Sequence, residues 1–192
     1  MRIFERNISW NDGKELTIRS LSEQDAMTVL SYLRQTCQET DYMSKYADEV
    51  DPAEEPERRL LKMLEEGELT LMLGVFWKEE LIATASILPV SAYEKMRHRG
   101  GLGISVKENF WGMGIGTLLL GVILEEAAQA GFEQVELEVM EENKRAIRLY
   151  EKNGFFAYGR RPYGIKLRDG RYVDELLMQK NLVERQAGKD RT

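Results

Sequence analysis

The residues with the clearest chemical potential form the glycine-rich segment GMGIGT, residues 112–117, between a strand-like run and an amphipathic helix-like run. The first turn of a helix has four backbone N–H groups without intrahelical acceptors. The aligned peptide dipoles place about half a positive charge at the same end. Glycines remove side chains that would keep an anion away from this backbone. The segment therefore predicts a cradle for a diphosphate that requires no lysine.

The spacing of these glycines argues against two other phosphate-binding loops. A P-loop requires G-x-x-x-x-G-K-[ST], but no lysine follows Gly116. A dinucleotide-binding turn requires G-x-G-x-x-G within a parallel βαβ unit, whereas this segment reads G-x-G-x-G after an expected antiparallel meander. From the glycines alone, an ordinary strand-to-helix turn without a ligand stays open as the alternative.

The composition indicates one globular domain with an acidic surface. The chain has 192 residues, of which 43% are hydrophobic and 31% charged, with a formal net charge of -6. This charge disfavours non-specific nucleic-acid binding and weakly favours cationic substrates. We expect a single domain over residues 1–192, with a core at about residues 15–182 and a polar tail at 183–192.

Residue usage also excludes several kinds of site. Cys37 is the only cysteine, so no intrachain disulfide forms, and the lone His98 argues against a His-rich metal site. The N-terminus lacks the apolar core of a signal peptide, and no apolar run reaches the roughly 20 residues of a membrane span. We therefore expect no metal and no membrane partner, and a cytoplasmic location by elimination.

Hydrophobic periodicity predicts the elements that position the glycine-rich segment. Ser22, with Asp25 three residues later, reads as the start of the first helix. Gly131 and Gly154 read as the stops of the last two helices. The expected strands are 15–20, 69–77, 81–89, 101–106, 135–139, 155–160 and 172–181, and the expected helices follow Ser22 or cover about 57–66, 115–130 and 143–153.

Two segments in register resemble the GNAT superfamily of N-acetyltransferases. The signature [QR]-x-x-G-x-[GA] places its glycines at Gly114 and Gly116, with Trp111 where the family has Gln or Arg. The later segment VELEVMEENKRAIRLYEKNGF is similar to the family's strand followed by N-x-x-A-x-x-L-Y-x-K-x-G-F. The positions in register are Asn143, Ala146, Leu149, Tyr150, Lys152, Gly154 and Phe155.

The resemblance implies an α/β (α+β) fold and an acetyl-CoA co-substrate. The fold would have a central mixed, mostly antiparallel seven-stranded sheet with flanking helices, splayed between the fourth and fifth strands. Acetyl-CoA would fill the gap, with its pantetheine arm along residues 104–106 and its diphosphate at 112–117. The implied cofactor-binding residues are Ile104, Ser105, Val106, Gly112, Met113, Gly114, Ile115, Gly116, Thr117 and Asn143.

By the same resemblance, Tyr150 is the catalytic general acid. A phenol has an unperturbed pKa of about 10 and a thiol about 8.5, so a neutral tyrosine can donate to the departing thiolate of CoA. Asn143 would bind the pantetheine, or cap the helix that begins at Lys144, and the two roles are compatible. The Thr117 hydroxyl is either a further donor to phosphate or an ordinary helix N-terminal residue.

The implied reaction is direct attack of an amine on the thioester within a ternary complex. Glu138, Glu39 and Asp41 are candidate bases, although each also fits a solvated surface carboxylate. By the resemblance, we expect the acceptor to be a primary amine of a small molecule or of a protein N-terminus. The ending GRRPYGIKLRDGRYVDELLMQK resembles a subgroup that includes ribosomal-protein acetyltransferases, and that subgroup does not fix a substrate.

Other interpretations stay open. A non-catalytic acyl-CoA-binding or sensor module could have the same fold, and a nucleotide-binding protein is a third option. Since members of the family often form dimers, the last strands could also pair across two subunits of a homodimer.

Overall fold

The computed structural model describes residues 1–10 and 13–183 of the chain. Within them, eight strands form one sheet in the order β1-β2-β3-β4-β5-β6-β8-β7, and only β5 and β6 are parallel neighbours. The strands are β1 Arg6–Trp10, β2 Lys14–Ser20, β3 Leu71–Trp77, β4 Glu80–Pro89, β5 Arg99–Val106, β6 Gln134–Met140, β7 Phe156–Lys166 and β8 Tyr172–Asn181. The helices are α1 Ala26–Glu39, α2 Glu54–Glu66, α3 Ile115–Gln129 and α4 Lys144–Lys152.

The structure confirms the predicted mixed α/β architecture and corrects two details of the sheet. The sheet has eight strands and not seven, because β1 pairs with β2 at the edge. Only Ile8 and Trp10 of this five-residue strand are partly buried, which is too short an alternation to indicate a half-buried strand. In addition, β7 continues to Lys166, beyond the predicted residue 160. The predicted polar tail lies outside the described residues except for Val183.

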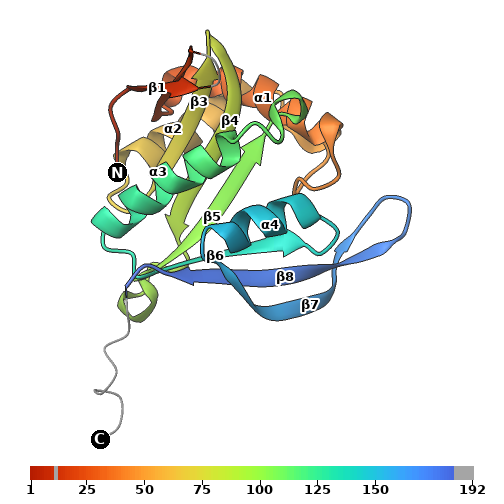
Figure 1. Cartoon of the computed structure of the whole chain (residues 1–192). Coiled ribbons are helices and arrows are strands. Elements are labelled where there is room, and N and C mark those ends of the chain that lie inside the picture. Colours follow the sequence, from red (N-terminus) through yellow and green to blue (C-terminus); the bar gives the residue numbers. More distant parts are fainter. Residues whose placement is uncertain (11–12, 184–192) are drawn as a thin grey trace, which may run out of the picture.

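Two apolar layers hold the helices against opposite faces of the sheet. Figure 1 shows α3 and α4 on one face, with α1 and α2 on the other. The larger core joins α3, α4 and the sheet, and it includes Leu119, Ile123 and Ile147. A smaller core under α1 and α2 includes Val29, Tyr32 and Leu61. Because neighbouring side chains of a strand point to opposite faces, β3 contributes Val75 to the first core and Phe76 to the second.

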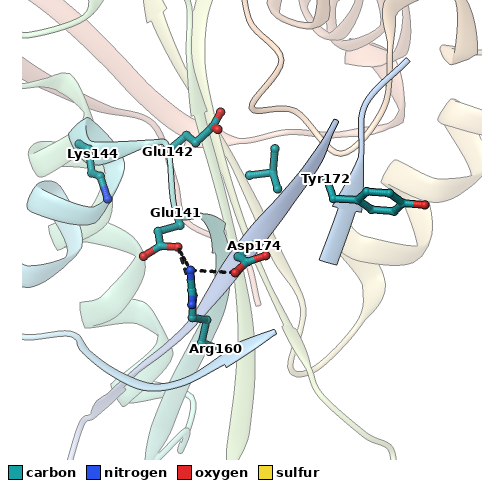
Figure 2. A pocket seen from close by; sticks show the side chains of 7 residues that line it. Glu141, Glu142, Lys144, Arg160, Tyr172 and Asp174 are labelled. Carbon is teal, nitrogen blue, oxygen red and sulfur yellow. Dashed lines mark hydrogen bonds and ion pairs between the residues drawn. The ribbon is translucent and has the colours of Figure 1, made fainter. Parts of the chain in front are cut away.

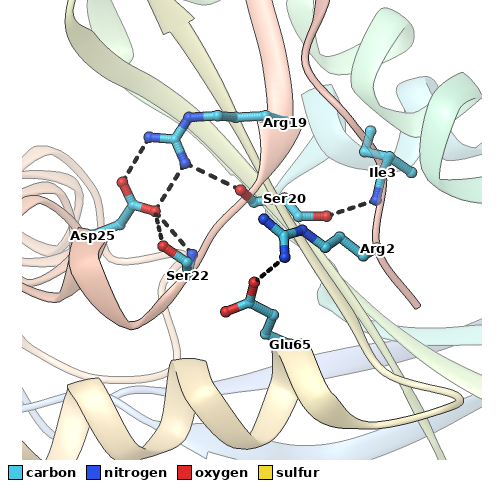
Figure 3. Close-up of polar contacts among 7 residues, drawn as sticks. All are labelled: Arg2, Ile3, Arg19, Ser20, Ser22, Asp25 and Glu65. Carbon is cyan, nitrogen blue, oxygen red and sulfur yellow. Dashed lines mark hydrogen bonds and ion pairs between the residues drawn. The ribbon is translucent and has the colours of Figure 1, made fainter.

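A partly buried ion pair fixes the start of α1 (Figure 3). The Arg19 guanidinium contacts both oxygens of Asp25, at 2.6 and 2.8 Å, and the backbone N–H of Ser22 donates to Asp25 Oδ2 at 2.8 Å. The chain therefore enters a helix at the Ser–Asp pair, as the sequence predicted. Burial of Asp25 opposes its ionisation, but the hydrogen bonds from Arg19 and Ser22 outweigh burial and lower the pKa of the carboxyl group.

Replacing Asp25 with asparagine is expected to lower the free energy of unfolding by about 1–2 kcal/mol at neutral pH, because Arg19 would lose its charged partner. A carboxylate with a lowered folded-state pKa stabilises the fold above its unfolded pKa, and this stabilisation disappears as the pH falls through the folded pKa. Urea unfolding of both proteins should therefore show the largest difference near neutral pH, and a shrinking difference below about pH 4.

The exposed Asp41 supplies the matched control. Asp41→Asn should change stability by less than about 0.5 kcal/mol at any of these pH values. A deficit of Asp25→Asn that stays constant from neutral pH down to about pH 3 would contradict the assignment of this stabilisation to the ionised carboxylate.

Candidate active site

The sheet opens where β5 and β6 part. The two strands form three residue pairs, Arg99–Gln134, Gly100–Val135 and Gly101–Glu136. The Arg99 guanidinium also contacts Glu136 at 2.6 Å, which closes this end of the gap. Beyond it, β4 still pairs with β5 up to Val106, and β8 still pairs with β6 up to Met140. The predicted splay between the fourth and fifth expected strands is therefore present, inside an otherwise continuous sheet.

The side chains of residues 104–106 on β5 point alternately to the two faces of the sheet and contact other residues there. Ile104 and Val106 pack against the core under α3. Ser105 points to the other face, where its Oγ lies 2.8 Å from the Tyr32 hydroxyl and 3.1 Å from Thr84 Oγ1. A ligand in the gap would therefore meet the backbone of these residues.

The glycine-rich segment forms a left-handed bend that opens α3. Gly112 and Gly114 have φ values of 76° and 84°, which side-chain-bearing residues rarely adopt. A Cβ added at either glycine would meet nothing within 4 Å, so the space in front of the bend is open. The Leu118 N–H donates to the Gly114 carbonyl at 3.0 Å. The amides of residues 115–117 therefore precede the first bond of the helix and point forward from its end.

Gly116 serves a different purpose from the other two glycines. A Cβ there would lie 3.1 Å from Leu149 Cδ2 of α4. This glycine therefore permits the close approach of α3 and α4, a role that the sequence analysis did not foresee. Ile115 is buried in the core, so only its backbone can face a ligand, whereas Met113 and Thr117 are exposed.

Two tryptophans hold the bend in place. Trp10 Nε1 donates to the Met113 carbonyl at 2.9 Å, which joins edge strand β1 to the bend. Trp111 Nε1 donates to the Val106 carbonyl at 2.7 Å, which ties the bend to the end of β5. The Trp10 contact spans 103 residues, and no local pattern in the sequence indicates it.

Helix α4 presents the other two predicted site residues. Asn143 Oδ1 accepts a hydrogen bond from the Ala146 N–H at 3.1 Å, so the predicted helix cap is confirmed. Tyr150 is buried, and its ring centroid lies 5.7 Å from that of Phe155. Burial raises the pKa of Tyr150 to about 12. The Tyr150 hydroxyl forms no hydrogen bond with any of the described residues. Every fully buried polar side-chain atom in that part of the chain has a hydrogen-bond partner, so the Tyr150 hydroxyl is accessible to solvent.

Two of the candidate bases are held by other groups. Both oxygens of Glu138 contact the Arg161 guanidinium, at 2.6 and 2.7 Å, and these hydrogen bonds lower the pKa of Glu138. Glu39 accepts bonds from the Glu108 N–H and from Gln35, both at 2.8 Å. Asp41 is exposed. In this arrangement Glu138 is a weak base.

Charged side chains surround a hollow beside the carboxyl end of β6 (Figure 2). Its volume is about 360 Å³. Arg160 bridges Glu141 at 2.7 Å and Asp174 at 2.8 Å across it, as Figure 2 shows. The lining residues are Glu141, Glu142, Lys144, Arg160, Tyr172, Val173 and Asp174. Arg171 contacts the third carboxylate, Glu142, at 3.6 Å, so each carboxylate of the hollow has a cationic partner.

A clasp joins the turn of the β7–β8 hairpin to the segment between α1 and α2. Arg168 contacts Asp48 at 2.7 Å, and its backbone N–H donates to the Tyr46 hydroxyl at 2.9 Å. The guanidinium also lies 4.0 Å from the centroid of the Tyr46 ring. No local pattern in the sequence indicates this clasp, because its partners are about 120 residues apart.

Residues 31–155 match the model of the acetyltransferase (GNAT) family. The match covers more than half of the chain, so the protein belongs to this family, and the resemblance inferred from the two motifs is confirmed. A curated relative, the uncharacterized N-acetyltransferase YobR of Bacillus subtilis (strain 168), is 38% identical over 90 residues. That alignment covers 46% of this chain and 34% of the relative, so the chain spans about a third of the relative's length.

Solved structures share the fold over nearly their whole length. A GNAT-family acetyltransferase from Streptococcus pneumoniae is 27% identical with a TM-score of 0.82, over 86% of this chain and 98% of the other. A ribosomal-protein-alanine N-acetyltransferase from Brucella melitensis is 25% identical with a TM-score of 0.75, over 86% and 99%. A putative acetyltransferase from Salmonella typhimurium, yncA, solved with its cofactor acetyl-CoA, is 19% identical with a TM-score of 0.78, over 91% and 98%.

None of the helices in residues 1–10 and 13–183 is long and apolar enough to span a membrane. The expected cytoplasmic location, single-domain organisation and homodimer stay predictions.

Replacing Gly114 with alanine is expected to lower the free energy of unfolding by about 1–2 kcal/mol, because a Cβ is strained in the left-handed conformation. The strain is conformational, since the added Cβ would meet no atom within 4 Å. Urea unfolding of the ligand-free protein measures the change.

Gly121 provides the control, since it is exposed within α3 and an added Cβ would likewise meet nothing within 4 Å. Gly121→Ala should raise the free energy of unfolding by about 0.5–1 kcal/mol, as expected for a helix interior. Equal effects of the two substitutions would show that the bend at Gly114 imposes no conformational demand.

Proposed function

We propose that this protein transfers the acetyl group of acetyl-CoA to a primary amine of a small molecule or a protein N-terminus, by direct attack in a ternary complex. One observation carries the proposal. Strand β5, which borders the gap, is tied at Val106 to the left-handed bend that opens α3. A long ligand with amides at one end and a diphosphate at the other fits this arrangement.

The pantetheine amides of acetyl-CoA would bond to the backbone of residues 104–106, where β5 has lost its neighbour. The diphosphate would accept bonds from amides at 112–117. Asn143 uses Oδ1 to cap α4, so its side-chain NH₂ group can donate to a pantetheine carbonyl. The acetyl-CoA complex of the Salmonella protein supports this choice of ligand, since the two proteins share the fold.

The reaction forms a C–N bond and breaks the C–S bond of the thioester. The amine nitrogen attacks the carbonyl carbon, the sulfur leaves with the bonding electron pair, and the nitrogen loses a proton. Tyr150, whose pKa of about 12 keeps it neutral, would donate a hydrogen bond to the sulfur as negative charge develops there. Because a thiol has a pKa of about 8.5, this phenol stabilises the thiolate mainly by the hydrogen bond.

The attacking amine must first be neutral, although an alkyl amine has an unperturbed pKa of about 10.4. Glu138 is unsuited to take its proton while Arg161 holds both carboxylate oxygens. We therefore place deprotonation at water or at the exposed Asp41, and leave Glu138 out of the catalytic set.

Two observations support a cationic acceptor. The chain carries a formal net charge of -6, which raises the local concentration of cations. In addition, the Brucella relative is named as a ribosomal-protein-alanine N-acetyltransferase. A panel of polyamines, amino acids and short peptides with free N-termini is therefore the appropriate acceptor screen.

Replacing Tyr150 with phenylalanine is expected to lower kcat about 10²-fold or more, because the thiolate would lose its hydrogen-bond donor. The KM for acetyl-CoA should stay nearly constant, since the donor acts on charge that develops in the transition state. Release of free CoA thiol, followed against the amine panel, measures both constants.

Tyr163→Phe is the matched control, because Tyr163 is 73% exposed and lies on β7. It should leave both constants unchanged. If the wild-type protein binds acetyl-CoA but turns over no amine, the protein is a non-catalytic acyl-CoA-binding module, and the proposed transfer is wrong.

A further inference from the structure

The bend carries an aromatic residue where the family motif has a hydrogen-bond donor. Trp111 occupies the Gln or Arg position of the signature, and an indole has a single N–H group. That group already donates to the Val106 carbonyl at 2.7 Å. Trp111 therefore has no donor to offer a phosphate.

A guanidinium from another element lies over this ring. The Arg145 Cζ atom of α4 is 4.3 Å from the centroid of the Trp111 ring, a distance typical of a cation–π contact. Arg145 is exposed, and no carboxylate within residues 1–10 and 13–183 forms an ion pair with it. Its planar set of N–H donors is thus held beside the glycine bend and is available to an anion.

The placement of Arg145 is unfavourable for the helix itself. The first turn of α4 contains Lys144 and Arg145 and no acidic residue. Cations at the N-terminus of a helix oppose its dipole. By contrast, arginines of the neighbouring hairpin are paired with carboxylates: Arg160, Arg161, Arg168 and Arg171. Among the described residues Arg148 of the same helix also forms no ion pair, so it is the contact with Trp111 that distinguishes Arg145 and places its guanidinium beside the bend.

The bend and α4 lie close enough to share one ligand. Gly116, in the first turn of α3, faces Leu149 of α4 so closely that an added Cβ would be 3.1 Å from Leu149 Cδ2. Arg145 precedes Leu149 by four residues, which is about one helical turn. At the other end of the bend, Arg145 contacts Trp111, so α4 contacts both ends of the bend.

We propose that Arg145 binds a phosphate group of CoA and supplies the donor that the motif position at Trp111 lacks. Trp111 acts as the platform that orients the guanidinium. This inference rests on the proposed function, and it names a binding residue that lies on a different element from the motif itself.

Calorimetric titration of the full-length protein with CoA tests the proposal. Arg145→Ala should weaken CoA binding about 10- to 100-fold, because a charge-assisted hydrogen bond is lost. At saturating acetyl-CoA, kcat should stay within about twofold of wild type, since the phosphates take no part in bond making. Arg145→Lys should give an intermediate affinity, because it keeps the charge but loses the planar fork. Trp111→Leu should weaken binding less than Arg145→Ala does.

The matched control removes the same charge from the same helix. Lys152 is exposed at the last turn of α4, two turns or about 10 Å along the axis from Arg145. Lys152→Ala should leave CoA affinity within about twofold of wild type. Repeating the titrations with 3′-dephospho-CoA identifies the contact. If Arg145→Ala weakens the binding of 3′-dephospho-CoA as much as that of CoA, Arg145 contacts the diphosphate. If Arg145→Ala binds 3′-dephospho-CoA as well as wild type does, Arg145 contacts the 3′-phosphate.

A thermal melt separates a binding role from a structural one. Ligand-free Arg145→Ala should melt within about 2 °C of wild type, and the rise in Tm caused by CoA should be smaller than in wild type. If wild type binds CoA and Arg145→Ala binds it equally well, the inference is wrong and the proposed function stands. If wild type itself does not bind CoA, the proposed function fails with it.

Discussion

The structure depends on the parting of two parallel strands in the middle of a hydrogen-bonded sheet. Backbone N–H and C=O groups that lose a neighbouring strand must find another partner. Pairing between β5 and β6 stops after Gly101 and Glu136, while their outer neighbours β4 and β8 continue. The sheet therefore holds its shape on both sides of an opening that a ligand with amide groups can enter. The remaining features of the site are arranged around this opening.

The crossover between these strands explains why the opening and the glycine bend lie together. Parallel neighbours require a long connection, and here α3 provides it between β5 and β6. The bend thus follows the strand that lines the gap, after one short 3-10 helix, Glu108–Phe110. Its glycines differ in purpose: Gly112 and Gly114 supply left-handed backbone, while Gly116 lets α4 approach. Packing of α4 against α3 then brings Tyr150 and Arg145 to the same side of the sheet as the bend.

Local pattern was enough to predict most of these elements. The expected strands all correspond to observed strands, and Asn143 caps α4 as anticipated, because apolar periodicity and cap chemistry are local properties. Strand β1 was missed because its residues are mostly exposed and its only partner is β2. The Trp10–Met113 bond and the Arg168–Asp48 clasp were missed for another reason, since each joins segments more than 100 residues apart. Interactions of that kind are decided by packing and leave no periodic signal.

The departure at Trp111 shows how a motif and its chemistry can separate. In the proposed cofactor site, Arg145 of α4 would supply beside the diphosphate the donor that Trp111 lacks at the motif position. In this chain the indole secures the bend to Val106 and presents a flat face, and α4 places a guanidinium on that face. The opposite case occurs at Glu138, which lies on the strand bordering the gap but is neutralised by Arg161. Position in the sequence therefore selects candidate residues, whereas the partners of each side chain decide which of them can act.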